Sequence, residues 1–168
     1  MGAYKYMKEN FQAEFSSRND ALRNRIVQWR DEPSVNRIQK PTNLGRAREL
    51  GYRAKQGVVV VRVRVRKGMR KREKPRGGRK PSKAGRFFSY DKSLQSIAEE
   101  RASRKFLNCE VLNSYYIGED GEYKFFEAIL LDRSHPSVQN DSRYAEIISQ
   151  KGRAFRGLTS AGKRHRGL

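Results

Sequence analysis

Residues 57–80 read GVVVVRVRVRKGMRKREKPRGGRK, a run of valines that becomes a ladder of arginines and then a basic tract. Side chains of a β-strand alternate between its two faces, so the valines at the odd positions of 59–65 share one face. That face is apolar throughout, and we expect it to contact the core. The stretch therefore predicts a strand over 57–66 that begins under cover on both faces.

The other face of this strand begins with Val58 and Val60 and ends with Arg62, Arg64 and Arg66. Arginines two residues apart on a strand stand about 6–7 Å from each other, which suits successive phosphates of a backbone. The guanidinium group also matches phosphate oxygens in bidentate fashion. The alternative is a solvated edge whose charges block pairing with another strand. Because the ladder continues into a basic tract, we favour phosphate binding and expect these arginines to point outward.

The basic tract, residues 67–92, is predicted as a loop without regular structure of its own. Its first twenty residues contain ten Lys and Arg against Glu73 alone, with glycines and prolines that oppose a helix. Such a segment becomes ordered when it meets phosphates. A localisation signal is the alternative for a basic run, but the length and the arginine content favour a binding extension.

The charge of the whole chain is uneven. The 168 residues carry a net charge of +20, with a pI of about 10.6. Residues 40–88 hold eighteen Lys and Arg against two acids, and residues 151–168 hold six against none, whereas residues 89–150 hold seven against eleven. This asymmetry predicts an oriented surface for a polyanion, which could be a nucleic acid, an anionic membrane or an acidic protein. The membrane is the weakest candidate, since no segment approaches the roughly 20 apolar residues of a spanning helix.

The N-terminal part of the chain is marked by apolar residues at helical spacing. Tyr4, Met7, Phe11 and Phe15 predict a helix over 3–15. We interpret this stripe as core packing, and stacking on nucleic acid bases is the alternative.

A second helix is predicted after Ser17 or Asn19, either of which can cap it, with Trp29 on its buried face. A loop and a short turn of helix follow, with Gly51 as the C-terminal cap.

The remaining elements follow the basic tract. They are a helix over 93–107 capped by Ser93, strands over 109–117 and 123–131 joined by an Asp120-Gly121 turn, and a short helix within 140–150. One strand, a helix and a hairpin define an α+β fold, with a small antiparallel or mixed sheet, packed helices and long basic extensions. We expect a single domain over 1–168, divided into N-terminal helices and loop (1–56), strand (57–66), basic loop (67–92), helix and hairpin (93–132) and a C-terminal segment with a basic tail (133–168).

No motif predicts catalysis. Residues 157–164, GLTSAGKR, approach the phosphate-binding pattern of nucleotide hydrolases, but Arg164 replaces the hydroxyl residue that coordinates magnesium, and no apolar strand precedes the motif. Cys109 is the one cysteine, and with only two histidines beside it a zinc site is not expected. Glu99 and Glu100 point about 100° apart on a helix, so we interpret them as a solvated face. We expect no enzyme and no cofactor.

Six blocks of the sequence together resemble a known family. They are MGAYKY at 1–6, GYRAKQG at 51–57, VRVRVRKG at 61–68, LQSIAEERASR at 94–104, VLNSYYIGEDGEYKFFEAILLD at 111–132 and FRGLTSAGKRHRGL at 155–168. In this order they resemble the archaeal/eukaryotic "fifteen-e" family of large-subunit ribosomal proteins. Members of that family usually continue past this ending with a further tail rich in Gly, Lys and Arg, whereas this sequence stops at Leu168.

The resemblance implies a structural component of the large ribosomal subunit that binds rRNA and neighbouring ribosomal proteins in the cytoplasm. It implies a three-layer α/β/α fold around an antiparallel sheet, no enzymatic activity, and magnesium only as an ion associated with the rRNA. We expect neither a membrane partner nor a homo-oligomer. The alternatives are a free nucleic-acid-binding protein or RNA chaperone outside the ribosome, and an enzyme that acts on nucleic acid.

The candidate rRNA-binding residues are the cations of the strand, the basic loop, the preceding loop and the C-terminal tail. They are Arg46, Arg48, Arg53, Lys55, Arg62, Arg64, Arg66, Lys67, Arg70, Lys71, Arg72, Lys74, Arg76, Arg79, Lys80, Lys83, Arg86, Arg153, Arg156, Lys163, Arg164 and Arg166.

Overall fold

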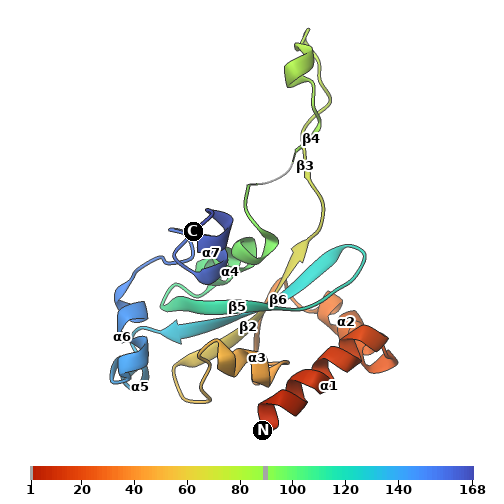
Figure 1. Ribbon diagram of the computed structural model, residues 1–168. Coiled ribbons are helices and arrows are strands. Elements are labelled where there is room, and N and C mark those ends of the chain that lie inside the picture. Colours follow the sequence, from red (N-terminus) through yellow and green to blue (C-terminus); the bar gives the residue numbers. More distant parts are fainter. Residues whose placement is uncertain (1, 89–90) are drawn as a thin grey trace.

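A computed structural model describes residues 2–88 and 91–168 of the chain (Figure 1). The helices are α1 (Ala3–Ser17), α2 (Asp20–Asp31), α3 (Leu44–Glu49), the 3-10 turn η1 (Pro81–Lys83), α4 (Leu94–Lys105), α5 (Pro136–Gln139), α6 (Ser142–Ser149) and α7 (Ser160–His165). The strands are β1 (Val35–Ile38), β2 (Val58–Arg66), β3 (Arg70–Lys71), β4 (Phe87–Phe88), β5 (Cys109–Glu119) and β6 (Tyr123–Asp132).

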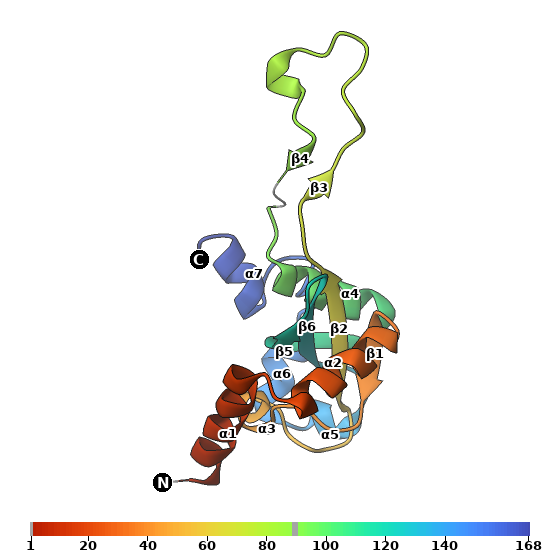
Figure 2. The same ribbon diagram turned by 90° about the vertical axis from the view of Figure 1, so that its right-hand side faces the viewer.

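The body is an antiparallel four-stranded sheet with the strand order β1-β2-β6-β5. Helix α4 covers one face, while α2 and α3 cover the other, which makes three layers and confirms the α+β class (Figures 1 and 2). The inner strands are β2 and β6, whose apolar sequences allow burial on both faces, while β1 and β5 form the two edges.

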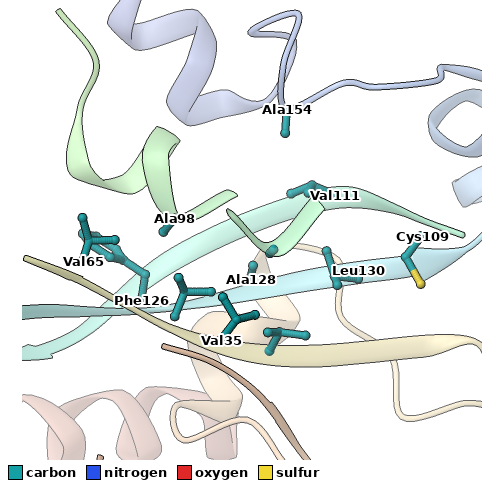
Figure 3. Packing of buried hydrophobic residues seen from close by; sticks show 12 residues of the cluster. Val35, Val65, Ala98, Cys109, Val111, Phe126, Ala128, Leu130 and Ala154 are labelled. Carbon is teal, nitrogen blue, oxygen red and sulfur yellow. The ribbon is translucent and has the colours of Figure 1, made fainter. Parts of the chain in front are cut away.

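The valine-arginine stretch forms the second strand of the sheet, as predicted. Val61, Val63 and Val65 are 0–2% exposed and pack against Ala98 and Ala102 of α4. Figure 3 shows this cluster, with Val65, Ala98 and Phe126 among its labelled side chains. The alternation of β2 therefore places its odd positions in the core, and its even positions on the face that α2 and α3 cover.

The hairpin turn is confirmed at Asp120-Gly121. The Asp120 carboxylate accepts hydrogen bonds from the backbone N–H groups of Glu122 (2.7 Å) and Tyr123 (2.6 Å), which closes the turn locally. The caps at Asn19 and Ser93 are confirmed as well, because their side chains accept from the N–H groups of Leu22 and Ser96.

Several short elements were not predicted from the sequence: β1, β3, β4, η1, α5 and α7. β1 pairs with β2 along its four residues and completes the edge of the sheet. Its sequence, VNRI, is too short and too polar to show a strand pattern, so β2 supplies the register that it lacks. The short helix α5, capped by the His135 side chain, was also missed.

The prediction that the aromatic stripe of α1 packs in the core is wrong. None of the described residues of α1 is buried, and Tyr4 and Met7 are 44% and 40% exposed. Within the stripe, Phe11 and Phe15 are half-buried, because α1 lies against the rim of the body and not over the sheet (Figure 2).

The interpretation of Glu99 and Glu100 as a solvated face is also wrong, since both are buried. The Glu99 carboxylate accepts hydrogen bonds from the hydroxyls of Ser114 and Thr159, both at 2.5 Å. Burial raises the pKa of Glu99, while the two hydroxyl donors oppose that shift. Glu100 pairs with Lys92.

The basic tract leaves the body as a long two-stranded extension (Figures 1 and 2). β3 and β4 pair antiparallel near its base, and η1 forms a turn near its far end. The tract is therefore more ordered than a loop without regular structure, although its paired segments are only two residues long. Residues 89–90 of the predicted loop lie outside the described residues.

Within residues 2–88 and 91–168, no helix is both long enough and apolar enough to cross a membrane.

Candidate nucleic-acid interface

The arginine ladder of β2 is divided between the interior and the surface. Arg62 is the inner member, with 12% of its side chain exposed. Its guanidinium donates to both carboxylate oxygens of Glu32 at 2.9 Å and lies over the Trp29 ring, 4.6 Å from the centroid. The prediction that Arg62 points outward is therefore wrong, because α2 covers this face and supplies its partners.

Arg62 also belongs to a buried polar cluster around Glu127, which lies opposite it in the β2–β6 register. Glu127 is fully buried and accepts from the Thr42 N–H (3.0 Å), the Thr42 hydroxyl (2.5 Å) and the Tyr115 hydroxyl. The Arg62 Nε lies 3.9 Å from Glu127 Oε1. Burial raises the pKa of Glu127, and the donors and Arg62 act against that shift.

The outer arginines of the ladder, Arg64 and Arg66, are progressively more exposed to solvent. Arg64 is half-buried, stacks over the Tyr123 ring at 5.2 Å and donates to the Arg30 carbonyl. Arg66 is exposed, and its side chain has no partner in the described part of the chain. The ladder is thus a gradient from an internal ion pair to an exposed charge, and not a row of equivalent phosphate contacts.

Three other half-buried candidate cations of the body, Lys55, Lys67 and Arg153, are engaged within the protein. Lys55 donates to the Asp141 carboxylate (2.5 Å) and to the Ser137 carbonyl (2.7 Å). Lys67 lies 3.1 Å from the Glu119 carboxylate and also binds a carbonyl of the hairpin turn. Both therefore close loops of the body, and their contact with RNA stays a prediction.

Arg153 is the third of these cations. Its guanidinium donates to the carbonyls of Val111 (2.6 Å), Leu112 (3.3 Å) and Leu158 (3.4 Å), which ties the C-terminal segment to β5. Burial lowers the pKa of Arg153, and the nearby carboxylate of Glu110 opposes that shift. Arg153 therefore has a structural role in the fold, and its contact with RNA stays a prediction.

The extension carries the largest set of exposed cations. Five of them have no side-chain partner within residues 2–88 and 91–168: Lys71, Lys74, Arg79, Lys80 and Lys83. Arg72 stacks over Phe88 at 4.1 Å, and Arg76 lies 3.4 Å from Glu73. The Nε of Arg86 is buried without a hydrogen-bond partner. The side chain of Arg70 lies outside the described residues.

The C-terminal cations lie on and beside α7, which packs against α4 near the base of the extension (Figure 1). They are Arg156, Lys163, Arg164 and Arg166, all exposed. The remaining candidates, Arg46, Arg48 and Arg53, are exposed on or after α3 at the other end of the body. Contact of these residues with RNA stays a prediction.

The segment GLTSAGKR is a packing motif in this fold. Thr159 caps α7 by accepting from the Gly162 N–H at 3.1 Å. A Cβ on Gly162 would lie 2.7 Å from the Gly157 Cα, and Gly157 itself has a φ of +66°. The two glycines therefore allow a close backbone approach that seats α7, and this explains the pattern without a nucleotide.

Among the described residues, no arrangement typical of catalysis is visible. Cys109 is buried, and burial raises the pKa of its thiol to about 11, so it is a poor nucleophile at neutral pH. In the described part of the chain, no group of three or more His, Cys, Asp or Glu side chains could hold a metal ion.

Sequence reasoning missed a recess of about 400 Å³ between α1, α3, β5 and α7. Lys8, Phe11 and Gln12 of α1 line it. These residues have the spacing i, i+3, i+4 and share one helix face. Of the three, only Phe11 belongs to the aromatic stripe that was interpreted as core packing.

An α+β body that carries a basic extension and a basic C-terminal segment is typical of proteins that bind folded nucleic acid. A family model described as Ribosomal L15 matches residues 2–168. The chain therefore belongs to the fifteen-e family of ribosomal proteins, as the resemblance of its six blocks indicated.

Family membership defines the general role of the chain. It is a structural constituent of the large ribosomal subunit, and so part of the cytoplasmic ribonucleoprotein that carries out translation. The family is structural and not enzymatic, and its proteins bind rRNA and other ribosomal proteins.

Proposed function

We propose that the exposed cations of the extension bind backbone phosphates of large-subunit rRNA and thereby stabilise its folded form, which supports translation. The observation that carries this proposal is the absence of protein partners for Lys71, Lys74, Arg79, Lys80 and Lys83, in the described part of a chain whose other cations are often paired. A segment this charged repels itself, and a polyanion removes that repulsion.

The C-terminal cations extend the same surface in the proposal. Lys163 and Arg164 belong to the seated helix α7, and Arg156 and Arg166 lie beside it, so the backbone that carries them has a defined position. The exposed side chains of the extension would enter between rRNA helices and screen their repulsion. Contacts to phosphate and sugar position the protein, and the shape of the RNA supplies specificity. No cofactor is needed, and magnesium participates only as an ion associated with the rRNA.

The test is the salt dependence of binding to a folded fragment of large-subunit rRNA. With on the order of 10 phosphate contacts, the slope of log affinity against log salt should be about −7 to −9. A flat dependence would overturn the mechanism. Sedimentation of the ribosome at moderate salt distinguishes a subunit component, which stays in the large-subunit peak, from a free RNA chaperone, which remains at the top of the gradient.

A further inference from the structure

The recess at the edge of the sheet has a composition that phosphate binding does not explain. It lies where α1 and α7 approach β5 from opposite sides, and Figure 2 shows both helices on the same side of the molecule with β5 between them. β5 is the last strand of the sheet, so no further strand covers this edge. The floor of the recess is therefore a surface that the protein leaves open.

Aromatic rings form one wall. Phe11 is half-buried and stacks against Phe15, with ring centroids 6.4 Å apart and planes at 20°. Phe15 in turn meets the edge of Tyr116 at 5.7 Å. Tyr116 is 37% exposed and lines the recess together with Phe11. This wall offers a partly exposed aromatic surface, held in place by neighbouring rings, on which a planar group can stack.

Amide groups surround the aromatic wall, and several have unused hydrogen-bonding capacity. Gln12 is exposed and has no side-chain partner among the described residues. Asn113 accepts from the Ser114 N–H at 2.9 Å through its Oδ1, which leaves its NH₂ group available. Asn43 likewise uses its Oδ1 to cap α3 at 2.9 Å, and its NH₂ remains available.

Gln95 supplies a hydrogen-bond acceptor, whereas the amides of Asn113 and Asn43 supply donors. Its NH₂ group donates to the carbonyl (3.0 Å) and the hydroxyl (2.9 Å) of Ser114. Its Oε1 accepts no hydrogen bond from the described residues. The recess thus presents both donors and an acceptor, and the edge of a nucleobase carries both as well.

The charge at the rim is positive. Lys8, Arg46 and Arg164 line the recess, and no acidic side chain of the described residues lines it. Glu49, just outside, lies 2.6 Å from Arg46 and 3.8 Å from Lys8 and offsets part of their charge. Arg164, on the opposite rim, is exposed and has no partner in residues 2–88 and 91–168. An anionic group beside the recess would therefore be stabilised.

From this geometry we infer that the recess binds one unpaired nucleotide of the RNA. The base stacks on the Phe11–Tyr116 wall, its edge meets the amides of Gln12 and Asn113, and its phosphate lies against Arg164. The inference rests on the proposed function, since it requires that the protein binds RNA, and it adds a site that recognises a base. A peptide segment of a neighbouring protein fits less well, because its backbone is neutral, whereas every nucleotide of an RNA strand carries a phosphate for the cationic rim.

The experiment maps base protection on the rRNA fragment with reagents that modify unpaired bases, with wild-type protein and variants. Gln12→Ala and Arg164→Gln change exposed side chains and leave the fold intact. Tyr116→Ala removes part of the stacking wall. The control variants are Tyr6→Ala, on the exposed face of α1, and Gln56→Ala, on an exposed loop. Neither residue lines the recess.

The expected result is one unpaired base that wild-type protein and both control variants protect, and that Tyr116→Ala and Gln12→Ala leave reactive. Tyr116→Ala should lower the affinity by about tenfold, as is typical for loss of one stacked base. Arg164→Gln should reduce the magnitude of the salt slope by about 0.7–0.9.

The failure of this inference differs from the failure of RNA binding. If the salt slope of the wild type is steep but all variants protect the same bases equally, the recess does not hold a nucleotide. If photocrosslinking from position 116 in the intact subunit labels a ribosomal protein and not rRNA, the occupant is a protein segment and the inference is overturned. A flat slope for the wild type would remove the proposed function itself.

Discussion

β2 and the extension that follows it carry the same residue types in one continuous stretch, yet their cations have opposite environments. Arg62 lies between Trp29, Glu32 and Glu127, whereas Lys80 and its neighbours on the extension are exposed on all sides. The difference arises from what lies over each segment. A strand inside a sheet has a face that a helix can cover, and α2 brings an acid to that face. The extension has no covering element, so its charges remain available.

The comparison teaches that an arginine in a basic protein is not by itself a contact to a polyanion. Internal cations such as Arg62 and Arg153 hold segments of the body together, and exposed ones carry the proposed interaction. When stability and RNA binding are measured on the same variants, substitution of internal cations should lower stability, and substitution of exposed cations should lower RNA affinity.

The largest effect is expected for RNA affinity when the extension is neutralised. Replacing Lys71, Lys74, Arg79, Lys80 and Lys83 together by Gln should reduce the magnitude of the salt slope by about 4 and the affinity on the order of 10³-fold at moderate salt. Filter binding or fluorescence anisotropy with the rRNA fragment measures both. The free energy of unfolding should stay within about 0.5 kcal/mol of the wild type, because none of these side chains is packed.

An unchanged salt slope in that variant would contradict the division between internal and exposed cations, since it would show that the extension does not bind phosphates. A large loss of stability would show that the extension belongs to the body.

The second effect is on stability. Arg62→Ala should lower the free energy of unfolding by about 3 kcal/mol, because it leaves the buried Glu127 without its nearest cation and removes the contact with Trp29. Urea unfolding followed by Trp29 fluorescence reports this directly, since Trp29 is the one tryptophan in the chain. The matched control is Arg66→Ala, four residues along the same face, for which we expect a change within about 0.5 kcal/mol. Equal changes in the free energy of unfolding for the two substitutions would contradict the difference in environment between Arg62 and Arg66.

A third test asks whether the segment that carries the C-terminal cations is packed, as the body is, or has no covering element, as the extension does. Gly162→Ala should destabilise the seating of α7 by about 1–3 kcal/mol, because the new Cβ would lie 2.7 Å from the Gly157 Cα. Amide hydrogen exchange over 159–168 should accelerate in the variant. Gly121→Ala is the control, since nothing lies within 4 Å of its Cβ position. Unchanged exchange after Gly162→Ala would indicate that α7 is not rigidly packed.

The smallest effect concerns the pH dependence of stability. Burial raises the pKa of Glu99 in the folded state, so the folded chain binds this proton more tightly than the unfolded chain does. The free energy of unfolding of the wild type should therefore decrease as pH rises from the ordinary glutamate range through the raised value. The glutamine of the Glu99→Gln variant does not titrate. The free energy of unfolding of this variant, relative to that of the wild type, should therefore increase over the same pH window and then level off.

Urea titrations at a series of pH values measure that difference. Glu73→Gln, on the exposed extension, is the control for removal of a carboxylate. A difference between Glu99→Gln and the wild type that does not vary with pH would show that Glu99 does not titrate in this range.

Local sequence signals predicted the elements well where side-chain alternation or a cap decides the structure. The β2 valines, the Asp120-Gly121 turn and the caps at Asn19 and Ser93 are of this kind. β1 was missed because four residues carry too little pattern and their pairing depends on β2.

The errors at α1 and at Glu99 have a common physical reason. Helical spacing shows that residues share a face, but it does not show what that face meets. The stripe of α1 meets the rim of the body and the open recess, and Glu99 meets two hydroxyls that satisfy it inside the core.

By itself the sequence determined the α+β class, the strand with its buried valine face, the hairpin and the concentration of positive charge, because alternation, turn chemistry and composition act over a few residues. Only the tertiary structure decided which cations are free, since the partners of Arg62, Lys55 and Arg153 come from residues 30, 86 and 42 positions away in the chain. It also decided that α1, β5 and α7 meet around an open recess. Such meetings depend on the packing of the whole chain, and no local pattern encodes them.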